Sequence, residues 1–237
     1  MTPPSSAAQR GAAPMVRSYG TTFAVDEDPI TEGGIWATGR RDGIDWADVV
    51  VKDGIAQGHP RRGEAAERHG RTTARPDAAD DQEYDDPSAV LLGRWGTNQH
   101  GRATVFSRNQ TSRYYQEVEI RLRMSMTAHR CTGYEVFWRC LRAEGAYVWI
   151  ARWNGPVADW TTLARKEGAE YGVENGDVIE ARIEGNVIRG FRNGVEVISA
   201  TDDTFNSGAP GIGFNYACDG TYVDHGLTTF EVETWDA

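Results

Sequence analysis

In the segment 116–124, apolar and polar residues alternate without interruption from Glu117 to Met124. A period of two places successive side chains on opposite faces of a β-strand, so this segment predicts a strand with one buried face. The apolar positions are Val118, Ile120, Leu122 and Met124, and the polar positions are Glu117, Glu119, Arg121 and Arg123.

Aromatic and β-branched runs separated by turn residues predict further strands along most of the chain. Before the first segment they lie at residues 21–25, 34–37, 49–51, 89–92 and 102–107, and after it at 132–140, 146–153, 178–183, 187–191, 195–200, 211–215 and 227–235. The pair Asn193-Gly194 predicts a tight hairpin, because a type I′ turn needs two residues that tolerate positive φ. The expected fold is therefore all-β: a sandwich or jelly roll of antiparallel sheets with very little helix.

Composition narrows the organisation and the partners. The 237 residues carry 25 basic and 35 acidic side chains, and the formal net charge of −10 argues against nucleic-acid binding through a basic surface. No apolar run approaches the roughly 18 residues of a membrane-spanning helix, so no membrane span is expected. Residues 19–237 are predicted to form one sandwich domain, interrupted at about 60–86 by a charged, flexible insertion. Residues 1–18 are predicted to be a disordered leader, and they lack the apolar stretch of a signal peptide.

The three cysteines suggest no metal site, because none of their spacings matches a Cys-x-x-Cys pair. Cys131 and Cys140 flank one predicted strand, and an extended strand of that length separates them by about 30 Å. They cannot form a disulfide with each other, although either could reach Cys218. Buried thiols are the favoured interpretation.

Two segments resemble the concanavalin A-like lectin and glucanase superfamily, whose members have laminin-G-like jelly-roll folds. TFAVDEDPITEGGIWATG at residues 22–39 resembles its opening strands, and residues 175–214, which end in GIGF, resemble its late meander. The resemblance covers most of residues 21–235, apart from the charged insertion. It implies two curved antiparallel sheets with a ligand usually bound on the concave face. The superfamily includes lectins, carbohydrate-binding modules, glycosidases, polysaccharide lyases and phage appendage domains, so fold similarity alone does not assign an activity.

The catalytic motifs of the enzymes in this superfamily are absent. Laminarinase-type glycosidases carry Glu-x-Asp-x-x-Glu or Glu-x-Asp-x-Glu on one strand, where alternate spacing directs the acids to one face. Glu117 and Glu119 share a face, but the next position on that face is Arg121. The motifs of alginate lyases are also missing, although Arg121 and Arg123 would suit an acidic sugar.

Aromatic residues are concentrated between Tyr134 and Trp160. If Val148 and Ile150 face the core, Tyr147, Trp149 and Trp153 face the other way, either as an exposed platform for sugar rings or buried beneath loops. If Val136 also points inward, Glu135 and Arg139 lie beside Trp149. The candidate ligand-binding residues are Arg121, Arg123, Trp138, Trp149, Trp153 and Trp160, and the candidate catalytic residues are Glu135, Arg139, Tyr147 and the loop histidine His129. Glu135 and Arg139 also have a simpler interpretation, as a salt bridge.

Acidic residues near both ends of the chain are candidates for a structural Ca²⁺ site. Asp26 and Asp28 follow the first predicted strand, and Asp236 follows the last. First and last strands are commonly neighbours in jelly rolls, and Ca²⁺ prefers carboxylate oxygens.

The leading functional prediction is polysaccharide binding on the concave face. One alternative is a polysaccharide lyase or glycoside hydrolase that uses the same face. A second is a structural or adhesive module of a phage tail or cell-surface assembly, which could form oligomers. A secreted, surface-associated or virion-associated protein is expected, while a cytoplasmic location stays open.

Overall fold

The computed structural model describes residues 16–39, 46–59, 86–110, 115–127, 129–217 and 222–236. Strands dominate these residues, and their helical elements are two short 3₁₀ turns, η1 (Ala169–Tyr171) and η2 (Tyr222–Asp224). No helix in this part of the chain is long and apolar enough to cross a bilayer.

One sheet has eight antiparallel strands in the order β13-β12-β11-β6-β15-β4-β3, and β1 also pairs with β15. Their bounds are β1 (Val16–Thr21), β3 (Asp48–Lys52), β4 (Ile55–His59), β6 (Asn98–Ser107), β11 (Val178–Glu184), β12 (Val187–Arg192), β13 (Val195–Thr201) and β15 (His225–Trp235).

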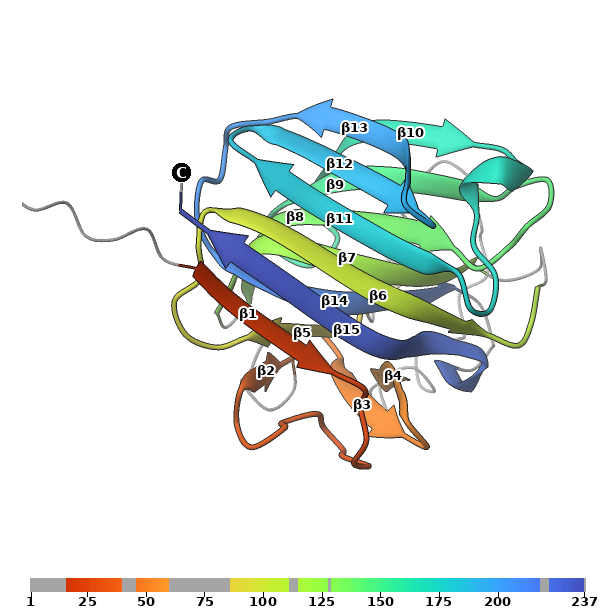
Figure 1. Ribbon diagram of the computed structural model, residues 1–237, viewed down its shortest axis with the longest axis horizontal. Helices are drawn as coiled ribbons and strands as arrows, with labels where there is room; N and C mark the ends of the chain where they lie inside the picture. The colour runs from red at the N-terminus through yellow and green to blue at the C-terminus, as the bar shows by residue number, and fades with distance from the viewer. Residues whose placement is uncertain are drawn as a thin grey trace, which may run out of the picture.

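The other sheet has seven antiparallel strands in the order β10-β9-β8-β7-β14-β5-β2. Their bounds are β2 (Trp36–Thr38), β5 (Ser88–Leu91), β7 (Tyr115–Thr127), β8 (Arg130–Arg139), β9 (Tyr147–Gly155), β10 (Trp160–Glu167) and β14 (Ala209–Ala217). The two sheets stack face to face, with the eight-stranded sheet nearer the viewer in Figure 1. This confirms the predicted all-β jelly-roll sandwich.

The core lies between the two sheets and follows the predicted alternation. Val118, Ile120 and Leu122 of β7 are fully buried in the main apolar cluster, as are Val148 and Ile150 of β9. Burying each such side chain stabilises the fold by about 1.5–3 kcal/mol. The alternation of β8, which the sequence left open, resolves with Val136 and Trp138 in this cluster and Phe137 on the opposite face.

The predicted Asn-Gly hairpin joins β12 to β13. Asn193 and Gly194 have φ values of 51° and 78°, which is the positive-φ pair that a two-residue turn of this type requires.

Some strand bounds differ from the prediction. The first strand is β1, which ends at Thr21, where the sequence predicted a strand to begin. β1 begins at Val16, inside the segment assigned to the leader. Residues 1–15 of that leader and residues 60–85 of the predicted insertion lie outside the described residues.

Cys131 and Cys140 are buried free thiols, so they do not pair with each other. Cys218 lies outside the described residues.

Candidate functional site

The outer face of the seven-stranded sheet, which points away from the other sheet, is unusually polar and aromatic. In three adjacent strands, β7, β8 and β9, the even-numbered residues point into the core and the odd-numbered residues point outward. The odd-numbered side chains of these strands therefore lie together on the outer face. We call these residues the outer-face group: Glu117, Glu119, Arg121, Glu135, Arg139, Tyr147, Trp149 and Trp153.

Antiparallel register places opposite charges side by side within this group. Arg121 of β7 is the partner of Glu135 on β8, and Glu117 is the partner of Arg139. Directly opposed residues in an antiparallel pair have Cβ atoms about 4.5–5.5 Å apart, so the two strands present complementary charges.

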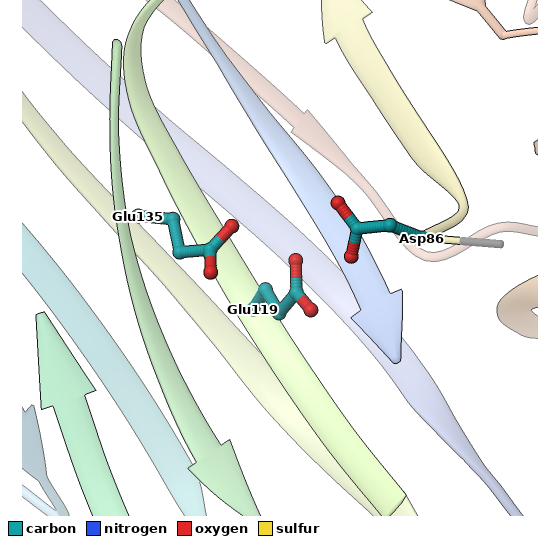
Figure 2. Close-up of side chains that lie close together, drawn as sticks. All are labelled: Asp86, Glu119 and Glu135. Atoms are coloured by element: carbon teal, nitrogen blue, oxygen red, sulfur yellow. The ribbon is translucent and has the colours of Figure 1, made fainter. Parts of the chain in front are cut away.

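Arg121 is the centre of a buried charge cluster. Its Nη2 donates to Asp86 Oδ2 at 2.7 Å and to Glu119 Oε2 at 2.6 Å, and its Nη1 lies 3.2 Å from Glu135 Oε2. Asp86 precedes β5, so the three carboxyl groups converge from three different segments, as Figure 2 shows. The Arg121 side chain has no exposed surface, and each of the three acids is almost completely buried.

Burial controls the protonation of these acids. It raises the pKa of Glu135 to about 7 and that of Glu119 well above its usual range, and nearby carboxylates add to the effect on Glu119. The pKa of Asp86 is also raised by burial, which its contacts with Arg121 only partly offset. Burial disfavours the charge of Arg121, but the three carboxylates outweigh that effect and hold its pKa well above the usual value. Arg121 is therefore cationic, and burial makes Glu119 harder to ionise than an exposed glutamate.

A second buried pair lies farther along β7. The Tyr147 hydroxyl donates to Glu117 Oε1. Burial raises the pKa of Glu117 to about 7, against hydrogen bonds from Tyr147 and Asn215 that favour its charged form. Burial and the adjacent carboxylate raise the pKa of Tyr147 well above its usual value. Glu117 can therefore gain or lose a proton close to neutral pH.

Two indole rings cover the charge cluster. Trp153 Nε1 donates to Glu135 Oε2 at 2.6 Å, and the Trp46 ring packs edge-on against Trp153 with ring centroids 5.7 Å apart. Trp46 also favours the charged form of Asp86 and so lowers its pKa. Both indoles are buried, so they shield the ion pairs from water.

A continuous aromatic group lies beside the cluster. Trp149 contacts Phe137, Tyr147 and Trp160, with ring centroids 5.6, 5.4 and 5.9 Å apart. Phe137 and Tyr147 are buried, whereas Trp149 and Trp160 are half-buried, so the face is neither a fully open platform nor a fully covered one. The Arg165 guanidinium lies 4.5 Å above the Trp149 ring.

Three predicted site residues lie away from this face. Trp138 points into the core between the sheets, because it shares the alternation of Val136. Arg123 is displaced by a break in the β7–β8 register between Leu122 and Ser125, and its side chain binds backbone carbonyls instead. His129 is an exposed residue of the turn between β7 and β8. These placements correct the sequence-based grouping.

The proposed calcium ligands do not come together. β1 and β15 are neighbours, as expected, but they are antiparallel, so residues that follow β1 and residues that follow β15 lie at opposite ends of the pair. Asp26 pairs with Lys52, and Asp28 lies 3.7 Å from His59. Asp236 lies 3.7 Å from Arg94.

The three acids of the charge cluster are spaced like the ligands of a metal ion, but an arginine lies among them. Asp86, Glu119 and Glu135 each offer an oxygen within 4.8 Å of the others. All three oxygens already contact the Arg121 guanidinium, which supplies the positive charge that a Ca²⁺ ion would provide. The donor set therefore does not fit a resident cation.

Sequence reasoning missed four members of the site. Asp86 was assigned to the insertion, Glu117 and Glu119 were set aside because an arginine follows them on the same face, and Trp46 carried no signal. The available signal was the pairing of Glu-x-Glu-x-Arg at 117–121 with Glu-x-Phe-x-Arg at 135–139, which antiparallel register makes complementary.

Comparison with solved structures identifies the fold. The carbohydrate-binding module CBM66 from Bacillus subtilis is 11% identical, with a TM-score of 0.51 over 88% of this chain and 96% of the module. The metal-free exoplasmic/lumenal domain of VIP36 is 9% identical, with a TM-score of 0.53 over 84% of each chain. A structure from work on endo-acting O-glycanases that human gut microbiota express to initiate mucin breakdown is 10% identical, with a TM-score of 0.51 over 91% of this chain and 98% of that one.

These similarities show a concanavalin A-like jelly-roll fold, as the sequence predicted. No protein-family model and no curated protein matches the sequence.

Proposed function

We propose that the protein binds a glycan on the outer face of its seven-stranded sheet, and that this is the concave face on which the sequence analysis expects the ligand. The observation that carries this proposal is the aromatic group around Trp149 and Trp160, whose half-buried rings adjoin a dense set of hydrogen-bonding side chains. Aromatic rings pack against the apolar faces of sugar rings, while polar neighbours fix their orientation.

Arg165 is the adjustable part of this surface. Its side chain is 53% exposed, so it can move from the Trp149 ring and donate to a sugar hydroxyl. Glycan stacking on Trp149 would then replace a cation–π contact that contributes only about 0.5–1 kcal/mol at an exposed site.

The charges of the face favour a neutral glycan. Asp86, Glu117, Glu119 and Glu135 outnumber Arg121 and Arg139. Arg121 contacts three carboxylates, and Arg139 donates to the Gly145 carbonyl oxygen at 2.6 Å. Because the buried acids outnumber the buried cations, the face suits a neutral glycan better than the acidic substrate of a lyase. Glycan binding also agrees with the expected secreted or surface location.

Isothermal titration against a panel of neutral polysaccharides tests the proposal. Trp149→Ala should weaken binding about tenfold or more, because loss of a central tryptophan contact typically costs at least about 1.4 kcal/mol. The matched control is Trp235→Ala: this tryptophan is also half-buried and also lies under an arginine, Arg182, but on the eight-stranded sheet. If no polysaccharide binds, or if both variants lose affinity equally, the proposal is wrong.

Glycoside hydrolysis is a second candidate, favoured by the acids beside the aromatic group. Glu117 and Glu135 each have a pKa of about 7, which suits a general acid at neutral pH. Both are 5% exposed, and this burial places binding ahead of hydrolysis, since a glycosidic oxygen must touch the acid. A reducing-end assay on the same panel decides between them: hydrolysis predicts activity that Glu117→Gln or Glu135→Gln abolishes, and binding alone predicts none.

A further inference from the structure

A cavity of about 450 Å³ lies at one end of the sandwich, away from the outer-face group. Its walls come from the start of β6, the β11–β12 turn and the connection from β13 to β14, which Figure 1 shows together at the left end of the molecule. Its volume lies within the roughly 300–1,000 Å³ of small-molecule sites. None of its lining residues belongs to the outer-face group.

Arg123 holds the three walls of this cavity together. Its Nε donates to Thr97 O at 2.6 Å, Nη1 to Phe205 O at 3.0 Å and Nη2 to Gly185 O at 2.8 Å. Its backbone has a φ of 51°, a costly conformation for an arginine inside a strand. Such a residue persists only where its surroundings enforce it, and here it fixes three separate segments around one space.

The Gln99 side chain connects Arg123 to two neighbouring segments through hydrogen bonds. Its Oε1 accepts from the Arg123 backbone N–H at 2.8 Å, and its Nε2 donates to Gly96 O and Gly208 O at 3.0 and 2.8 Å. Gly208 has a φ of 144°, and a Cβ there would lie 2.3 Å from the Arg123 carbonyl carbon. The loop can therefore approach Arg123 only with glycine at this position.

The β13–β14 connection is anchored on its inner side. The Tyr134 hydroxyl donates to Asp202 Oδ1 at 2.7 Å and accepts from Phe205 N at 2.9 Å, while Arg152 Nη1 donates to Asp202 Oδ2 at 2.6 Å. The Phe205 ring packs edge-on against Tyr134 with centroids 5.8 Å apart. This anchoring preforms the wall of the cavity.

Several exposed polar side chains line the open side of this cavity, where they can contact a ligand. Asp203, Asn186 and Asn206 line the cavity at solvent-exposed positions, and none of their side chains forms a hydrogen bond to another described residue. Ser207 and the half-buried Phe205 complete the lining on this side. A carboxylate, two amides and a hydroxyl beside an aromatic ring match the alternating hydroxyl and C–H surfaces of a sugar.

We infer that this cavity is a second ligand site, which takes a neutral, hydroxyl-rich ligand of monosaccharide size, such as the terminal unit of a glycan. A neutral ligand fits because Asp203 contributes negative charge and the Arg123 guanidinium is committed to carbonyl oxygens. The inference is independent of the outer-face proposal, because different residues carry it.

Amide NMR spectra of the ¹⁵N-labelled full chain test this site with glucose, galactose, mannose and N-acetylglucosamine as probes. At least one sugar should shift resonances of the β11–β12 turn and residues 203–208 at millimolar concentration. Asp203→Ala and Asn206→Ala should each weaken that binding about tenfold, the loss expected for a hydrogen bond that involves a charged or strongly polar group. Glucuronate should bind much more weakly than the neutral sugars.

Ser199→Ala is the control, because Ser199 is an exposed residue of β13 outside the cavity lining. Its affinity should equal that of the unchanged protein, and the same spectra report whether each variant is folded. The inference is overturned if none of the four sugars produces shifts at the cavity, or if such shifts persist unchanged in both cavity variants. Equal binding of glucuronate would overturn the assignment to neutral ligands. Trp149→Ala should leave this binding unchanged, which separates it from the outer-face site.

Discussion

Replacing Glu117 with glutamine should change the pH dependence of stability. Glu117 is 5% exposed, and burial raises its pKa to about 7 from the 4.5 of an unperturbed glutamate. Glutamine keeps nearly the same shape, and its Oε1 can still accept from the Tyr147 hydroxyl, but it cannot ionise. The substitution therefore removes a titration while preserving most of the packing.

The size of the effect follows from the difference in pKa between folded and unfolded states. A difference of about 2.5 pKa units at 1.36 kcal/mol per unit gives roughly 3 kcal/mol. Because the folded-state pKa is the higher one, this stabilisation is complete below about pH 4.5 and is lost as the pH rises through about 7. The free energy of unfolding of Glu117→Gln, relative to the unchanged protein, should rise by up to about 3 kcal/mol over this range.

Urea unfolding at a series of pH values from about 4.5 to 8.5 measures this difference. Glu144→Gln is the matched control, because it also removes one carboxylate, but at an exposed position in the turn before β9. A pH-independent difference for Glu117→Gln would refute the argument that burial controls this carboxyl group.

Three further expectations follow from buried groups. Arg121→Met leaves three acids without their cation and should lower the free energy of unfolding at neutral pH by about 3–5 kcal/mol in urea titrations, and a loss below 1 kcal/mol would contradict the ion-pair geometry. Trp138→Ala empties a fully buried position and should cost about 3–5 kcal/mol in the same assay, without the loss of affinity expected for an outer-face residue. Burial raises the pKa of Cys131 to about 12 and that of Cys140 still higher, so both thiols should resist alkylation in the folded protein and react in urea, as mass spectrometry can show.

The alternation of side chains made most of the fold predictable. Strands with one face in the core, such as β7, carry a period-two pattern that one sequence displays directly. β1 was predicted at the wrong residues and two other strands, β10 and β4, were missed. The positions of these two strands explain why. β10 is at the edge of its sheet and is half-exposed along its length, so WTTLARKE needs no apolar alternation. β4 is short, and its residues IAQGH include only two apolar positions.

The site was predictable only where one strand determined it. The alternation of side chains within β9 predicted that Tyr147, Trp149 and Trp153 share the face opposite Val148 and Ile150, and they lie there. The position of Arg123 was predicted wrongly, because a break in the β7–β8 register turns its side chain away from the outer face. A pattern of alternating residues does not reveal such a break. The three acids proposed as calcium ligands lie apart for a topological reason, since adjacency of β1 and β15 does not bring Asp26 near Asp236 when the strands run in opposite directions.

The charge cluster shows why a search for catalytic motifs along one strand missed the acids. In Glu-x-Glu-x-Arg, Arg121 occupies the position where a third acid would complete a single-strand motif. The third and fourth carboxyl groups come from Glu135 on β8 and from Asp86 before β5. Arg121 binds three of the four acids, whereas Glu117 instead accepts a hydrogen bond from Tyr147. Arg121 thus forms ion pairs with three of the acids, and these ion pairs stabilise the fold. Glu117 has a pKa near 7 and makes no contact with Arg121. If the outer face performs any proton transfer on a glycan, Glu117 is therefore the residue through which it should occur.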